Sequence, residues 1–300
     1  MIPYVRQFEF EYGVASRVSP LIERVIAPNP GPFTFTGTGS YLVGRSHPGA
    51  EIAVIDPGPL DDAHLKALLS AVADRRVSHV LVTHTHRDHA PLARPLAEAT
   101  GALICAAKAP ERETHASSAG DEDEDGGFQP DVVLEDGEVM AGDGWTIEAV
   151  ATPGHASNHL AFALKEENVL FSGDHVMGWS TTVVAPPDGS MRDYLASLDK
   201  VIGRDFATIW PAHGPPITDV APFLEAYRAH RLEREAQVIA RLRAGDRTVS
   251  EMTPVLYAAV DQRLWPAASL SVLAHLIKLV EDGMVVAEPR PALSATFRLN

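Results

Sequence analysis

The sequence is poor in cysteine, has no long apolar run and has no excess of basic residues. Its one cysteine among 300 residues, Cys105, excludes an internal disulfide and indicates a reducing compartment. No apolar run approaches the roughly 20 residues that span a bilayer. The first residues lack the basic and apolar regions of a secretory signal. We therefore expect a cytoplasmic protein without a membrane segment.

Acidic residues outnumber basic ones, 40 against 25, which gives a formal net charge of -15. Such a field repels polyanions, so it disfavours RNA as a partner and favours a small-molecule substrate. A third of the excess lies in the acidic run 121–125. We interpret this run as a solvated loop without a function of its own.

Short apolar runs alternate with amphipathic stretches up to about residue 216, which is typical of sheets layered with helices. Two segments between strand-like runs, Asp136-Gly137 and 165–168, are predicted to be hairpin turns. The expected strands are 33–43, 52–55, 77–82, 102–106, 145–150, 159–164, 169–171 and 206–210, and the expected helices are 61–73, 91–100 and 191–202.

The pattern changes after Pro216, where strand signals stop. Residues 223–242 are predicted to form one long amphipathic helix that is rich in arginine. Further helical patterns and two short strands, 284–287 and 293–299, follow it. This order of helices and then a hairpin is typical of a small winged-helix-like domain. We therefore expect a catalytic domain at 1–216 and a C-terminal domain at 217–300.

Histidine and aspartate gather directly after strand-like runs. His84 and His86 lie two residues apart on extended backbone, so they project to the same side and can share one metal ion. Asp88 and His89 lie where the chain turns toward the next helix, so they can face a second ion. These ligand types suit zinc, with iron and manganese as alternatives.

Ligand-type residues also follow three later strands. His155, Asp174 and His213 each lie beside glycine or proline at a predicted strand end. Loops at strand ends of a layered sheet converge, so we expect these side chains to meet the first group.

The series His84-x-His86-x-Asp88-His89, followed by His155, Asp174 and His213, resembles the metallo-β-lactamase superfamily over residues 30–216. The resemblance implies an α/β fold, the αβ/βα sandwich, with a dinuclear site at one edge. The implied ligands are His84, His86 and His155 on the first metal and Asp88, His89 and His213 on the second, with Asp174 bridging both.

A more detailed similarity covers nearly the whole chain. Residues 29–33 with 41–44, 134–137, 167–174 and 181–183 look like the lactamase-beta-2 branch, which adds a C-terminal winged-helix-like domain. The resemblance implies an endoribonuclease acting on single-stranded RNA as one function of that branch. The sequence departs from the branch at Gly39-Ser40, where Asn-Thr is expected, and at His175, where cysteine is expected.

Two cations about 3.5 to 4 Å apart lower the pKa of a water molecule between them and polarise a substrate oxygen. The predicted function is therefore a dinuclear metal-dependent hydrolase that uses a metal-bridging hydroxide, most favourably on small esters, thioesters or lactones. A single-stranded RNA endoribonuclease is the alternative. Hydrolysis of β-lactams ranks third, because an export signal is missing.

Two residues are candidates for catalytic roles beside the metals. Asp88 can orient the attacking water or pass its proton to the leaving group. His159 is a candidate hydrogen-bond donor to a ligand or a contact for the substrate, and a structural histidine is the alternative.

Further side chains near the motifs are interpreted as packing residues: His175, Tyr194, Trp179, Met177 and Cys105. The alternative for His175, Trp179 and Met177 is a place at the pocket, and the alternative for Tyr194 is an oxyanion donor. The near balance of charges from Gly245 onward indicates that the C-terminal domain packs or forms a homodimer rather than gripping nucleic acid.

Overall fold

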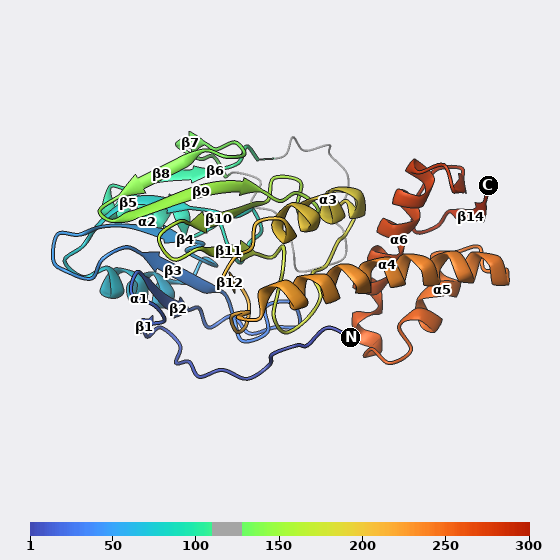
Figure 1. Cartoon of the computed structure of the whole chain (residues 1–300), viewed down its shortest axis with the longest axis horizontal. Coiled ribbons are helices and arrows are strands. Elements are labelled where there is room, and N and C mark those ends of the chain that lie inside the picture. Colours follow the sequence, from blue (N-terminus) through green and yellow to red (C-terminus); the bar gives the residue numbers. More distant parts are fainter. Residues whose placement is uncertain (110–127) are drawn as a thin grey trace.

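The computed structural model describes residues 1–109 and 128–300. The acidic run 121–125 therefore lies outside the described residues. Two sheets lie at one end of the molecule, and a long helix leads from them to the C-terminal elements at the other end (Figure 1).

The first sheet has seven strands in chain order. Neighbours are antiparallel from the first strand to the fourth and parallel from the fourth to the seventh. Parallel neighbours need crossover connections; α1 (Asp62–Val72) connects the fourth strand to the fifth, and α2 (Ala93–Thr100) connects the fifth to the sixth. The strands are β1 (Ser16–Arg17), β2 (Ile22–Ile26), β3 (Gly39–Val43), β4 (Glu51–Ile55), β5 (Arg76–Leu81), β6 (Leu103–Ala106) and β7 (Val132–Val133).

The second sheet has five strands in the order β12-β11-β10-β9-β8. Its neighbours are antiparallel except β11 and β12, which are parallel and are connected through α3 (Met191–Ile202). The strands are β8 (Val139–Gly142), β9 (Trp145–Ala151), β10 (Leu160–Leu164), β11 (Val169–Gly173) and β12 (Thr208–Pro211).

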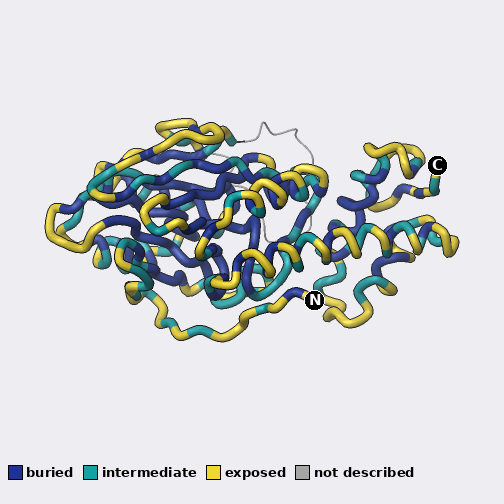
Figure 2. The backbone as a smooth tube through the Cα atoms, in the orientation of Figure 1, coloured by how far each residue is buried: buried dark blue, intermediate teal, exposed yellow. Residues whose placement is uncertain are grey.

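Apolar side chains fill the space between the sheets and cover both outer faces. Tyr41 of β3 and Phe162 of β10 belong to the core between the sheets. Leu68 of α1 packs on the outer face of the first sheet, whereas Tyr194 of α3 packs on that of the second. Figure 2 shows most of the strands buried, apart from β1, β7 and β8 at the sheet edges, and the outer helix faces exposed. The αβ/βα sandwich expected from the sequence is confirmed.

The helix α4 (Val220–Ala244) packs in two cores. Phe223 contacts the outer face of the second sheet, and Val238 packs in a separate C-terminal core. That core is completed by α5 (Val249–Leu256), η1 (Gln262–Leu264), α6 (Trp265–Glu281) and the antiparallel pair β13 (Val285–Glu288) and β14 (Thr296–Leu299). The winged-helix-like order of helices and hairpin is confirmed, and a boundary near residue 216 stays a prediction.

One predicted turn is wrong, and four short strands were not predicted. Asp136-Gly137 carries the chain from β7, at the edge of the first sheet, to β8, at the edge of the second, so it joins no hairpin. Residues 165–168 do join the antiparallel strands β10 and β11. The unpredicted strands are β1, β2, β7 and β8.

By length and mean hydropathy, which is 1.3, the helical stretch Gln262–Glu281 would suffice to cross a membrane. Its residues Val272, Leu276 and Leu279 pack into the C-terminal core. Core helices of soluble proteins meet the same criterion. The expected absence of a membrane segment therefore stays a prediction.

Candidate metal centre

The structure brings together all seven predicted ligand residues. They come from the loop after β5, the loop between β9 and β10, the residue after β11 and the loop after β12. Their ligand atoms form three overlapping groups, each within 4.8 Å: His84, His86 and His155; His84, His89 and Asp174; and Asp88, His89 and His213.

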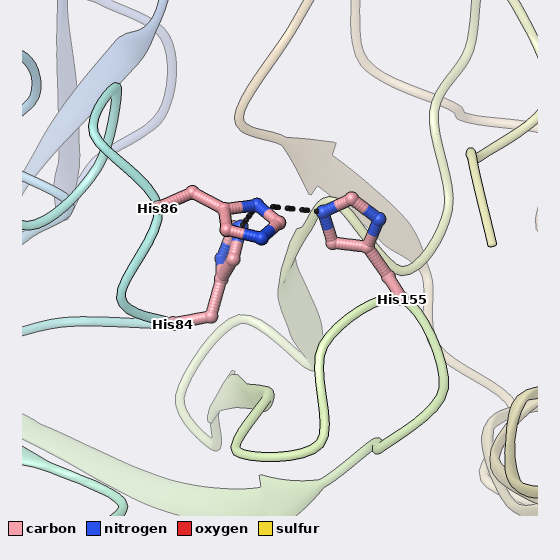
Figure 3. A group of neighbouring side chains, drawn as sticks. All are labelled: His84, His86 and His155. Carbon is pink, nitrogen blue, oxygen red and sulfur yellow. Dashed lines mark hydrogen bonds between the residues drawn. The ribbon is translucent and has the colours of Figure 1, made fainter. Parts of the chain in front are cut away.

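Ring nitrogens of His84, His86 and His155 point toward one another (Figure 3). Nδ1 of His86 lies 2.9 Å from Nε2 of His84 and 3.1 Å from Nε2 of His155. Nitrogens that share a tetrahedral zinc ion are roughly 3.3 Å apart. Burial lowers the pKa of His84, and it lowers the pKa of His86 to about 3. Both rings are therefore neutral at pH 7, which is the form that binds metal.

The second group combines imidazoles with carboxylates. Oδ2 of Asp88 lies 3.4 Å from Nε2 of His89 and 3.1 Å from Nε2 of His213. Burial by itself lowers the pKa of His213, but the Asp174 and Asp88 carboxylates outweigh it and raise the pKa to about 10. The negative potential that favours a proton here also favours a metal cation.

Asp174 lies between the two groups. Its Oδ2 is 3.8 Å from Nε2 of His155, whereas its Oδ1 is 3.3 Å from Nε2 of His213. The preceding Gly173 has a φ of 51°, and a Cβ atom there would lie 2.6 Å from Nε2 of His159. Only glycine therefore allows the chain to present Asp174 at this point.

The outward nitrogens of two ligand histidines are held by backbone carbonyls. Nδ1 of His155 donates to the Val183 carbonyl at 2.7 Å, and Nδ1 of His213 donates to the Gly37 carbonyl at 3.3 Å. Such bonds fix the ring orientation and leave the inner nitrogen as the ligand.

Asp56 is a site residue that the sequence analysis missed. Its Oδ2 accepts hydrogen bonds from Nδ1 of His89 at 2.9 Å and from Oγ1 of Thr83 at 2.8 Å, and its Oδ1 accepts from the Thr83 backbone at 2.8 Å. It follows β4 in the sequence Ile55-Asp56-Pro57-Gly58. A carboxylate at a strand end beside glycine and proline is the same signal that identified Asp174.

Three buried polar atoms at the centre of the site have no hydrogen-bond partner among the described residues: Nε2 of His89, Oδ1 of Asp174 and Nε2 of His213. Buried polar atoms are normally satisfied, and cations between them would satisfy these three. The complete set of five imidazoles and two carboxylates suits zinc. The residues therefore fit divalent metal ions, whose number and identity stay predictions.

Both ring nitrogens of His159 have partners. Nδ1 donates to Oγ1 of Thr152 at 2.8 Å, and Nε2 accepts from the Asp174 backbone N–H at 3.2 Å. This arrangement favours positioning of Asp174 over contact with a substrate, and the catalytic role of His159 stays a prediction. His175 is fully buried, and its carbonyl accepts a hydrogen bond from the Tyr194 hydroxyl at 2.8 Å, which agrees with packing roles for both residues.

A cavity of about 170 Å³ opens beside the centre. His155 and Asp174 line it, and so do Met177 and Trp179, for which lining the pocket was the alternative to packing. The C-terminal elements also line the cavity, through Tyr257, Val260, Leu264, Ala267, Ala268 and Ser271. The cavity thus combines the candidate metal centre with apolar surface from two parts of the chain.

An αβ/βα sandwich with histidines and aspartates gathered at one edge defines the class of metal-dependent hydrolases with this fold. The sequence matches the model of the metallo-beta-lactamase superfamily over residues 34–213 and that of the beta-lactamase associated winged helix domain over residues 248–291. This chain belongs to the metallo-beta-lactamase superfamily, and it is a hydrolase.

Relatives match most of the chain. The beta-lactamase-like protein 2 homolog of Caenorhabditis elegans is 33% identical over 273 residues, covering 90% of this chain and 87% of the relative. An atrochrysone carboxyl ACP thioesterase of Aspergillus chevalieri is 34% identical over 293 residues, which cover 94% of this chain and 88% of the relative. A beta-lactamase domain protein from Burkholderia ambifaria has the same fold, with a TM-score of 0.77, 20% identity and coverage of 100% and 97%.

Proposed function

We propose that this protein is a thioesterase that depends on two divalent metal ions, and that small esters and lactones of similar size are further substrates. One observation carries the proposal. Asp174 lies between two groups of ligand atoms and lines a cavity that has apolar walls. Such a cavity suits the acyl part of a substrate, and the centre beside it suits attack on a carbonyl. The thioesterase names of several relatives favour thioesters within this class.

The proposed ligands of one ion are His84, His86 and His155. Those of the other would be Asp88, His89 and His213, and Asp174 would be shared between the two ions. When bound, divalent ions lower the pKa of water toward neutrality and polarise a carbonyl oxygen.

The residues of the chain prepare the site for this chemistry. Asp56 and the Val183 carbonyl hold two of the ligand rings in place. Burial raises the pKa of Asp88, but the adjacent His89 and His213 outweigh this effect and hold the pKa well below its usual range. Asp88 is thus ionised, and its side chain is 24% exposed, so its carboxylate is placed to accept a proton from the attacking water and pass it to the leaving thiolate, which departs as the thiol.

The decisive experiment is an assay of thiol release from acyl thioesters. Protein treated with chelator is compared with the same protein reloaded with zinc, manganese or iron. Cys105 is buried, so it contributes little background to a thiol reagent, and a Cys105→Ser variant controls for the remainder. Metal-dependent release from thioesters supports the proposal. Absence of release with every metal, from protein that has taken up the ions, contradicts it.

The contacts of α4 do not favour single-stranded RNA, the alternative substrate. Arg228 is paired with Asp199 at 2.5 Å, and Arg241 is paired with Asp246 at 2.6 Å. A groove that tracks a nucleic-acid backbone needs basic side chains free to contact phosphates. These pairs reduce the basic surface that the arginine-rich helix offers, so we retain thioesters as the proposed substrates.

A further inference from the structure

Arg231 of α4 is a buried arginine to which the described part of the chain supplies no acidic partner. It is 4% exposed, and within residues 1–109 and 128–300 no carboxylate forms an ion pair with it. A guanidinium stays charged inside a protein, and a buried charge is costly unless it is paired. The neighbouring Arg228, by contrast, has Asp199 as its partner.

Neutral groups hold Arg231 in place. Its Nη2 donates to the Thr182 carbonyl, and its Cζ lies 4.9 Å from the ring centre of Tyr194 and 5.9 Å from that of Tyr227. Ring faces and a carbonyl stabilise a cation but do not neutralise it. Nε has no hydrogen-bond partner among the described residues. The guanidinium therefore retains capacity for an anion, which carboxylates satisfy with strong, charge-assisted bonds.

Arg231 lines the same cavity as the candidate metal centre. A two-residue segment connects them. Oγ1 of Thr182 donates to the Asp174 carbonyl at 2.8 Å, and the Val183 carbonyl accepts from His155 at 2.7 Å. An anionic group bound by Arg231 therefore lies in the cavity in which the substrate is cleaved.

The remaining lining is mostly apolar, and the cavity is small. Trp179, held by stacking on Phe35 at 4.8 Å between ring centres, lines the cavity together with Val260 and Leu264. A volume of about 170 Å³ is below the roughly 300–1,000 Å³ of typical ligand sites. It suits a short acyl chain with one charged end better than a nucleotide.

We propose that Arg231 binds a carboxylate on the acyl group of the substrate, so that the enzyme prefers thioesters of short dicarboxylic acids over neutral thioesters of the same length. This inference rests on the proposed thioesterase function and specifies its substrate class. Arg231 is then a specificity-determining residue.

The test compares two N-acetylcysteamine thioesters of equal chain length, glutaryl and pentanoyl. We expect kcat/KM of the metal-loaded parent to favour the glutaryl thioester by about 10- to 100-fold, which is the range for a hydrogen-bonded charge pair. Arg231→Gln is expected to remove this preference by lowering kcat/KM for the glutaryl thioester alone. Arg231→Lys keeps the positive charge but lacks the planar guanidinium, so it is expected to retain part of the preference for the glutaryl thioester. This variant replaces Arg231→Gln in the test if the glutamine variant does not fold.

Arg234 provides the matched control. It lies one turn further along α4, stacks on Tyr257 at 4.3 Å and donates to the Leu256 carbonyl at 2.7 Å. It does not line the cavity. Arg234→Gln should therefore keep the preference for the glutaryl thioester even if it lowers stability, because loss of packing alone does not change the ratio for the two substrates.

Binding of the free acids separates this inference from the proposed function. Each acid has one carboxylate that can occupy the metal centre, and glutarate has a second carboxylate at its other end. The difference between their affinities, measured by calorimetry, therefore reports the binding of this second carboxylate. Tighter binding of glutarate that is lost in Arg231→Gln supports the inference even if no thioester is cleaved. Equal kcat/KM and equal affinities in the parent overturn the inference and leave the thioesterase intact. Loss of RNA cleavage in Arg231→Gln, with an unchanged ratio for the thioesters, assigns the residue to phosphate and also overturns it.

Discussion

Asp56 and His89 form a fully buried pair, with Oδ2 of Asp56 2.9 Å from Nδ1 of His89. The carboxylate fixes the ring so that Nε2 points into the candidate metal centre. It does so from a backbone φ of 47°, which aspartate and asparagine tolerate better than most residues.

Asp56→Asn is expected to weaken metal binding by about 10- to 100-fold, the usual effect of losing a partner behind a ligand. The amide offers one acceptor oxygen where Thr83 and His89 need two. Competition with a chelator of known affinity measures the change. Asp61→Asn is the control, because Asp61 caps α1 and asparagine caps equally well. Equal metal affinities of the Asp56 variant and the parent would contradict the proposed support of His89.

Purified protein is expected to hold close to two divalent ions per chain. Asp174→Ala is expected to reduce both metal content and activity more than His159→Ala. Asp174 faces both groups of ligand atoms, whereas His159 contacts the Asp174 backbone. Loss of the His159 ring should lower metal affinity or activity by about 10- to 100-fold. Elemental analysis and thiol release on the two variants measure this. Parent-like metal content in Asp174→Ala would show that the bridging role is misassigned.

Hydrolysis of neutral thioesters is expected to change little with salt. A nuclease that neutralises several phosphates on a single strand loses affinity with a slope of about -0.7 per phosphate on a logarithmic plot. Rates are measured at subsaturating substrate from about 0.05 to 0.5 M salt. Efficient cleavage of single-stranded RNA that falls steeply with salt, together with inactivity on thioesters, would favour the alternative function.

His275 is expected to make the fold less stable as the pH falls. Burial, aided by nearby cations such as Arg231, lowers its pKa from 6.5 to about 3. Between these pH values the unfolded chain binds a proton that the folded chain does not. The stability that the neutral His275 ring contributes is therefore fully present above pH 6.5, and it falls by about 1.4 kcal/mol per pH unit between pH 6.5 and pH 3.

His275→Leu tests this expectation, because it removes the titrating ring and retains an apolar side chain of similar size. Urea unfolding of parent and variant at pH 7.5 and pH 5.0 gives the two free energies of unfolding. The parent should lose about 2 kcal/mol more than the variant between these pH values. If the free energies of unfolding of parent and variant differ by the same amount at pH 7.5 and pH 5.0, the assignment to His275 is contradicted.

Local sequence patterns located most of the regular elements. The helix α3 begins and ends where its pattern predicts, because Ser190 caps a clear amphipathic stretch. The short strands β7 and β8 carry no such pattern, since both residues of β7 are exposed. Whether a turn such as Asp136-Gly137 joins two strands of one sheet or carries the chain to another depends on contacts between distant segments, which local pattern does not encode.

The sequence by itself determined the types of ligand residue and their order along the chain. Histidines and aspartates that follow several strand-like runs predict a metal site, because the loops at strand ends lie at the edge of a sheet and converge there. The tertiary structure alone decided which carboxylate stands behind His89 and which arginine of α4 lies inside the protein. Asp56 is 33 residues from His89 in the sequence. Arg231 and Arg228 have similar positions in the helical pattern of α4, but Arg231 is buried beside the cavity, whereas Arg228 lies at the surface. Burial and pairing depend on what the fold brings to each position, and that is the physical reason why the structure was needed to recognise both residues.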